Sequence, residues 1–276
     1  MPTLEARNLV KNFTLRSGLK TSTLQAVKDV SFTIEAGKTI ALVGESGSGK
    51  STIARMLMKL ETPTSGEIHI NGALSGTRGK ALADYRSEVQ MVFQDPFASL
   101  NPFHTIFHHL ERPLRIHHPE LNKAQVRQRA LELLERVRLT PAENFADRRP
   151  HELSGGQRQR VAIARALAPG ARFIVADEPV SMLDVSIRLG VLNLLADLQR
   201  EDNLGVLYIT HDLATARHFS DEIMVLYHGD VVERGPSDEV ILNPQHDYTK
   251  TLLEAAPEPE NMGQLRDQVR HELAGA

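Results

Sequence analysis

The sequence of 276 residues contains no cysteine. Disulfides, thiolate metal sites and iron–sulfur clusters are therefore excluded, and a reducing compartment fits this absence. No apolar run approaches the ~20 residues that a membrane-spanning helix needs. The first residues, Met1 to Arg7, show no apolar signal core after a basic start. We therefore expect any membrane role to be exerted through a partner.

The sequence also has no large excess of either charge. It has 32 Lys and Arg against 35 Asp and Glu, for a net charge of -3 at pH 7. Without a bulk positive field, nucleic acid is not expected as a partner. Hydrophobic residues make up 41% of the chain, which is too many for a disordered protein. The length suits one large domain, or one domain with a subdomain.

The apolar residues that are present predict two kinds of strand. Residues 39–43 and 172–176 are nearly continuous apolar runs, as in parallel strands buried on both faces. Residues 4–10 and 26–34 alternate apolar and polar side chains, which is typical of antiparallel strands. A hairpin loop is expected between them, over Arg16–Ser22. Further strands are expected at 67–70, 88–93, 205–210, 222–227 and 231–233.

A glycine-rich turn follows the buried strand at 39–43 and precedes a predicted helix from Ser51 to about Leu60. The turn fits the phosphate-loop pattern G-x-x-x-x-G-K-[ST]. Its glycines let backbone N–H groups turn toward phosphate oxygens, Lys50 supplies a charge, and the Ser51 hydroxyl can bind Mg²⁺. The expected ATP-binding residues are Gly44, Glu45, Ser46, Gly47, Ser48, Gly49, Lys50, Ser51 and Thr52.

Two carboxylates, Asp177 and Glu178, come directly after the apolar run at 172–176. An acidic group there is costly unless it is paired or bound to a metal, and parallel sheets place ligands at the carboxyl ends of their strands. Asp177 is the expected Mg²⁺ ligand, and Glu178 could polarise the attacking water. The alternative is a solvated acidic turn before a helix.

The run from Leu153 to Leu167, LSGGQRQRVAIARAL, resembles the signature segment of ATP-binding-cassette (ABC) proteins. The other family motifs follow in order. Gln94 matches the Q-loop glutamine, Asp184 lies in a segment like the D-loop, and His211 matches the switch histidine. Phe13 falls where the family places an aromatic ring under adenine, with ordinary core packing as its alternative.

The resemblance implies a fold and a set of roles. The fold is α/β, a P-loop NTPase core with an antiparallel β subdomain and a helical insertion, about residues 96–168, that carries the signature. Residues 1–256 would form the ATP-binding domain and 257–276 a tail, with a possible helix over Gln264–Leu273. Gln94, Glu178 and His211 would serve catalysis, and Ser51, Gln94 and Asp177 would hold Mg²⁺.

In this family the signature covers ATP that is held by another subunit. The resemblance therefore implies a head-to-tail dimer, with itself or with a homologous ATPase. The signature residues expected to bind the γ-phosphate precede a helix, whose free N–H groups favour an anion. They are Ser154, Gly155, Gly156 and Gln157, and Asp184 of the D-loop is a further expected ATP-binding residue.

Three segments, 94–102, 180–186 and 243–253, resemble the branch that imports dipeptides, oligopeptides and nickel. The resemblance implies two membrane permeases, an extracytoplasmic solute-binding protein acting indirectly, and a peripheral location on the cytoplasmic face of the membrane. A groove beside Gln94 would receive a permease helix. Its candidate apolar contacts are Phe97, Leu100, Phe103 and Ile106, with ordinary burial within the insertion as the alternative.

Three alternatives stay open at this stage. The same ATPase could serve an oligosaccharide or nickel importer. It could also be a soluble ATPase of the family that acts in translation or DNA repair, or a regulatory module without catalysis. The intact set Lys50, Asp177, Glu178 and His211 argues against the last alternative.

Overall fold

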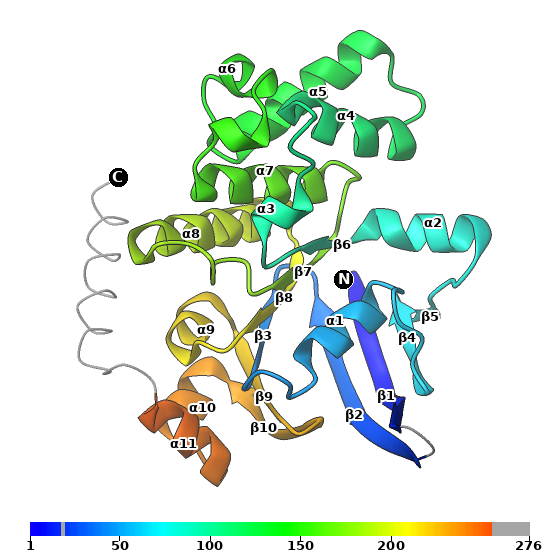
Figure 1. The fold of residues 1–276 in the computed structure, drawn as a ribbon, viewed down its shortest axis with the longest axis vertical. Helices are drawn as coiled ribbons and strands as arrows, with labels where there is room; N and C mark the ends of the chain where they lie inside the picture. Colours follow the sequence, from blue (N-terminus) through cyan, green and yellow to red (C-terminus); the bar gives the residue numbers. More distant parts are fainter. Residues whose placement is uncertain (18–19, 256–276) are drawn as a thin grey trace.

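The computed structural model describes residues 1–17 and 20–255, and these form two β-sheets with helices around them (Figure 1). The predicted helix at Gln264–Leu273 lies outside the described residues. The α/β fold is confirmed, with one mostly parallel and one antiparallel sheet. The division into residues 1–256 and a tail stays a prediction.

The larger sheet has six strands in the order β10-β9-β3-β8-β7-β6. All of its pairings are parallel except the one that adds β10 at the edge. Parallel pairing brings the carboxyl ends of β3, β6, β7, β8 and β9 to one edge of the sheet. Their bounds are β3 (Thr39–Val43), β6 (Val89–Val92), β7 (Phe173–Asp177), β8 (Gly205–Thr210), β9 (Glu222–Tyr227) and β10 (Asp230–Pro236).

The smaller sheet is antiparallel, in the order β2-β1-β4-β5. Strands β1 (Thr3–Ser17) and β2 (Lys20–Glu35) remain paired as far as Ser17 and Lys20, so the loop predicted over Arg16–Ser22 is wrong. Residues 20–25 include the β-branched Thr21 and Thr23, which suit a strand even when it is polar. β4 (Ser65–Ile70) and β5 (Ala73–Leu74) complete the sheet.

A run of helices between β6 and β7 forms the predicted insertion, drawn in green at the top of Figure 1. The side chain of Thr105 caps α4 by accepting a hydrogen bond from the backbone N–H of His108, so this helix begins at Ile106. The helices are α3 (Pro96–Ser99), α4 (Ile106–His117), α5 (Lys123–Arg136), α6 (Ala142–Ala146) and α7 (Gly155–Leu167), with a 3₁₀ turn at Pro150–Glu152.

Six further helices of the described chain pack on the sheets. Helix α1 ends three residues before the predicted Leu60, because Lys59 has a positive φ of 53°. Helix α2 and the three helices after β8 are not predicted from the sequence. The six are α1 (Lys50–Leu57), α2 (Gly79–Glu88), α8 (Val185–Asp202), α9 (Leu213–Phe219), α10 (Ser237–Leu242) and α11 (Asp247–Glu254).

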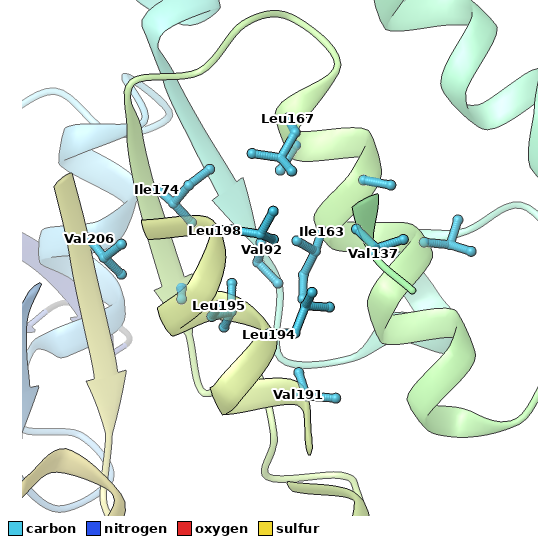
Figure 2. Close-up of a cluster of buried hydrophobic side chains, with 14 of the residues drawn as sticks. Val92, Val137, Ile163, Leu167, Ile174, Val191, Leu194, Leu195, Leu198 and Val206 are labelled. Carbon is cyan, nitrogen blue, oxygen red and sulfur yellow. The ribbon is translucent and has the colours of Figure 1, made fainter. Parts of the chain in front are cut away.

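Figure 2 shows the core between the large sheet and two helices. Val92, Ile174 and Val206 project from the sheet toward Ile163 of α7 and Leu195 of α8, and all are nearly inaccessible. Each such side chain contributes about 1.5–3 kcal/mol relative to exposure. This packing fixes α7 and α8 against the strands that carry the site. Within the described residues no helix is long and apolar enough to span a bilayer.

Candidate nucleotide-binding site

The loops that leave β3, β6, β7 and β8 meet at the carboxyl edge of the large sheet. They carry the phosphate-loop pattern, Gln94, Glu178 and His211 respectively, and Asp177 is the last residue of β7. These loops border a cleft of about 990 Å³. Of the predicted site residues it is lined by Phe13, Glu45, Ser46, Gly47, Gly49, Lys50, Ser51, Thr52, Gln94, Glu178 and His211.

At two positions of the phosphate loop, neighbouring atoms leave room for glycine but not for a side chain. A Cβ on Gly44 would lie 2.2 Å from the Leu226 carbonyl oxygen, and one on Gly49 would lie 2.4 Å from that of Ala26. Gly49 also has a φ of 114° as the N-cap of α1, a conformation that L side chains rarely adopt. Among the described residues no side chain caps α1. The N–H of Thr52 donates to the carbonyl of Gly49 at 3.0 Å, which within the described residues leaves the N–H groups of Lys50 and Ser51 open to an anion at this helix end.

Lys50 is 5% exposed, and its Nζ donates to the carbonyl oxygens of Gly44 at 2.6 Å and Glu45 at 2.8 Å. Burial lowers the pKa of Lys50, and the carboxylates of Glu178, Asp177 and Glu45 act against this. Within the described residues Lys50 makes no ion pair shorter than 4 Å. A phosphate group would give this buried ammonium a counter-charge.

Asp177 ends β7 next to the cleft, and burial raises the pKa of its carboxyl. The Glu178 charge raises this pKa further, whereas the Ser51 hydroxyl and Lys50 lower it. A hydroxyl and a carboxylate, both hard oxygen donors, are the ligands that Mg²⁺ prefers. The Ser51 hydroxyl and the Asp177 carboxylate therefore fit Mg²⁺. The charge of the ion would offset the free-energy cost of the half-buried carboxylate.

Glu178 is held from several sides. Its Oε2 accepts a hydrogen bond from Nε2 of Gln94 at 2.9 Å, and its Oε1 lies 3.2 Å from Nδ1 of His211. Its backbone N–H donates to the carbonyl of Ile209 at 2.9 Å, and its own carbonyl accepts from Ser181. The φ of Glu178 is 44°, an uncommon value for a residue other than glycine. Such conformations persist where surrounding contacts determine them, often at functional sites.

The signature residues do not line this cleft. Ser154 is the N-cap of α7 and forms a capping box with Gln157, with bonds of 3.3 and 3.0 Å. A Cβ on Gly156 would lie 2.5 Å from Cγ2 of Ile187, so this glycine lets α7 approach α8 closely. Asp184, the N-cap of α8, is likewise not among the residues that line the cleft. If these groups bind ATP, the nucleotide belongs to another chain.

Several residues of the cleft are not predicted from the sequence. Phe13 borders it as expected, with Nζ of Lys11 5.0 Å from the ring centroid, but Leu24 on the paired strand also lines it. The pairing of Phe13 with Leu24 could have indicated this, since both would face one side. For the others the sequence carries no local signal. They are Ala26, Arg188, Asp212, Leu213, Leu252 and Ala255.

The four apolar residues expected in a permease groove divide into two pairs. Phe97 is 53% exposed and Phe103 is 81% exposed, so they can meet a partner. Leu100 and Ile106 are 1% and 0% exposed, so their predicted contact role is wrong. They belong to the core of the helical insertion. The exposed Phe97 ring is covered on one side by the guanidinium of Arg158, 4.1 Å from its centroid.

Two family profiles match the sequence. The first, "ABC transporter", covers residues 27–181, and the second, "Oligopeptide/dipeptide transporter, C-terminal region", covers residues 232–275. The chain is 47% identical over 261 residues to the dipeptide transport ATP-binding protein DppF of Haemophilus influenzae, a match that covers 93% of this chain and 78% of that protein. It is also 47% identical to the oligopeptide transport ATP-binding protein OppF of Bacillus subtilis, over 93% of this chain and 83% of the relative.

Solved structures agree with these sequence matches. The dimeric ATP-binding cassette MJ0796, in a post-hydrolysis state bound to ADP and Pi, superposes with a TM-score of 0.73 at 34% identity. The match covers 85% of this chain and 98% of that one. The chain thus has the fold of an ATP-binding cassette. The chain belongs to the ABC transporter family and is an ATP-binding, ATP-hydrolysing cassette.

Proposed function

We propose that this chain hydrolyses ATP to drive the uptake of dipeptides and oligopeptides through two partner permeases. The match of residues 232–275 to the C-terminal region of oligopeptide/dipeptide transporters carries the substrate class. The names of the two relatives support it. The chain would work at the cytoplasmic face of the membrane, with a solute-binding protein delivering peptide on the other side. A nickel or oligosaccharide importer is the alternative within the same branch.

The residues of the cleft support distinct roles in ATP binding and hydrolysis. The loop N–H groups and Lys50 bind the phosphates, and Phe13 stacks on adenine. Ser51, Asp177 and Gln94 would hold Mg²⁺, which when bound would neutralise charge on the phosphate oxygens. Glu178 polarises the attacking water, and His211 steadies that water and the γ-phosphate.

The signature supports a second step, in which two cassettes close on ATP head to tail. Ser154–Gln157 and Asp184 of one cassette would cover the γ-phosphate that is bound in the other. Closure can only be driven by the difference in ATP affinity between the closed and open dimers. Exposed Phe97 and Phe103 would pass this movement to the permeases, because both lie in the segment between Gln94 and α4.

Reconstitution tests the substrate class. The tagged chain is isolated with its membrane partners and its solute-binding protein, and ATP hydrolysis in liposomes is measured with dipeptides, oligopeptides, nickel or an oligosaccharide. Peptides should stimulate hydrolysis, and Glu178→Gln should abolish the stimulation. Stimulation by nickel or an oligosaccharide alone would reject the peptide proposal. Isolation with ribosomes and without membrane proteins would reject transport altogether.

A further inference from the structure

The helix α11 reaches the phosphate loop, although 203 residues separate the two contacting positions in the sequence. The hydroxyl of Tyr248 accepts a hydrogen bond from the backbone N–H of Glu45 at 3.0 Å. Two more residues of this C-terminal end, Leu252 and Ala255, line the same cleft as Lys50 and Ser51. In Figure 1, α11 lies at the bottom left of the molecule, at the opposite end from the helical insertion that carries the signature. The cleft therefore has a wall made by the C-terminal segment.

Tyr248 is itself held firmly in place. Its ring packs on that of Tyr227 at the end of β9, with centroids 4.1 Å apart. Its backbone N–H donates to Nδ1 of His246, the N-cap of α11. The turn before the helix is tied to the large sheet, because the Glu233 carboxylate accepts the N–H groups of Gln245 and His246 at 2.8 and 3.0 Å. The phenol is thus presented to the loop from a rigid support.

The backbone of Glu45 is hydrogen-bonded through both its N–H and its carbonyl. Its carbonyl accepts Nζ of Lys50 at 2.8 Å and the N–H of Ser48 at 3.2 Å. Tyr248 accepts the hydrogen bond from the N–H of the same residue. Further along the loop, Gly47 has a φ of 82°, and a Cβ added to it would meet no atom within 4 Å, so little packing restrains the loop there. The hydrogen bond to Tyr248 therefore fixes the backbone at Glu45, whose carbonyl oxygen accepts a hydrogen bond from the Lys50 ammonium.

We propose that Tyr248 is a positioning residue of the nucleotide site, and that α11 sets ATP affinity by holding the start of the phosphate loop at Glu45. This rests on the proposed placement of ATP in the cleft. Loss of the bond lets the loop populate arrangements that do not bind phosphate, and the apparent affinity falls by the fraction that remains competent. Movement of the C-terminal segment would change ATP affinity without any contact between Tyr248 and the nucleotide.

The test uses the full chain and a fluorescent ATP analogue with Mg²⁺. Tyr248→Phe keeps the ring and removes the hydroxyl, and it should weaken binding about 3- to 10-fold, the effect of one lost hydrogen bond. Tyr227→Phe is the matched control, since within the described residues the Tyr227 hydroxyl makes no hydrogen bond. It should bind as the wild type does. The melting temperatures of both variants without nucleotide should stay close to that of the wild type.

Hydrogen–deuterium exchange gives a second measurement that a general loss of packing would not reproduce. The peptide that contains Glu45 should exchange faster in Tyr248→Phe and unchanged in Tyr227→Phe. Wild-type affinity in Tyr248→Phe, or equal weakening in both variants, would overturn the inference. Lys50→Ala distinguishes an error in the placement of ATP from an error in the role of Tyr248. If that variant binds the analogue as the wild type does, the placement of ATP fails as well; if it binds weakly while Tyr248→Phe is normal, only the role of Tyr248 fails.

Discussion

Nε2 of Gln94 donates a hydrogen bond to Oε2 of Glu178 at 2.9 Å, which joins the segment after β6 to the carboxylate after β7. The other oxygen, Oε1, lies 3.2 Å from Nδ1 of His211. Both carboxylate oxygens are therefore engaged, and since each has a second lone pair, either can still accept a hydrogen bond from a water that Glu178 polarises. The hydrogen bond from Gln94 offers a route by which movement of the insertion alters catalysis.

Replacement of Glu178 by glutamine should stop turnover and spare binding. The amide cannot accept a proton, so the hydrolysis rate should fall about 10²- to 10⁴-fold, the usual contribution of general base catalysis. Lys50 and the loop N–H groups remain, so ATP affinity should stay within about 3-fold of the wild type. Phosphate release and analogue titration measure the two quantities. Hydrolysis at the wild-type rate would remove Glu178 from this role.

The edge of the large sheet was predictable because its signals are local. Residues 39–43, 172–176 and 205–210 are each a mostly apolar run that leads into a segment with polar side chains, and parallel pairing brings those ends together. Parallel pairing of these strands is enough to bring Lys50, Glu178 and His211 to one cleft.

Contacts between distant segments were not predictable in this way. The bond from Glu45 to Tyr248 spans 203 residues, and neither residue carries a local signal for the other. The prediction that Leu100 and Ile106 contact a permease was also wrong, because an apolar residue near an exposed loop can point into the core or out of it. Only the packing of the insertion decides between these directions.

The head-to-tail arrangement predicts complementation between two inactive variants. Lys50→Ala lacks phosphate binding, and Ser154→Arg places a bulky cation at the start of α7, where the signature would meet γ-phosphate. Each variant alone should hydrolyse ATP at least about 10-fold more slowly than the wild type, the loss expected when one such interaction of ~1.4 kcal/mol is removed. A mixed dimer contains one intact site, made by Lys50 of one chain and Ser154 of the other.

Mixing the two variants should therefore restore part of the activity, measured as phosphate release against the ratio of the chains. A mixture of Lys50→Ala with Lys50→Ala/Ser154→Arg is the control, because it contains no intact site. Activity no higher than that of the separate variants would argue against a shared site between two copies of this chain.

His109 predicts acid sensitivity of the fold. It is 9% exposed, and Nε2 lies 3.1 Å from the carbonyl oxygen of Asn101. Burial lowers its pKa, and the nearby Arg165, His108 and His104 lower it further against the effect of the Asn101 bond. The unfolded chain then binds a proton below about pH 6.5 that the folded chain does not.

Stability from this group is present above about pH 6.5 and is lost as the pH falls through the lowered folded pKa. The melting temperature should therefore drop between about pH 7 and pH 5. His109→Gln keeps a donor for Asn101 without titrating, so its drop should be smaller, whereas His151→Gln, an exposed control, should follow the wild type. Equal slopes in all three proteins would contradict this account.

The stack of Arg158 on Phe97 predicts how the signature helix communicates with the permeases. Arg158 lies on α7, and its Nε donates to the Pro150 carbonyl at 2.6 Å, so the guanidinium is fixed over the exposed ring of Phe97. Cation–π contacts at such sites contribute about 0.5–1 kcal/mol. Phe97→Ala should leave ATP affinity unchanged but lower peptide-stimulated hydrolysis in liposomes about 3- to 10-fold, because an apolar contact with the permease is lost.

Arg158→Ala should reproduce part of this uncoupling, since it frees the ring without removing it. Ile116→Ala is the control, because Ile116 is an apolar residue on α4 that is also exposed, at 66%. If all three variants uncouple equally, loss of exposed apolar surface anywhere on the insertion would explain the effect. If Phe97→Ala is fully coupled, the permeases meet the cassette elsewhere, and Phe103 becomes the next residue to test.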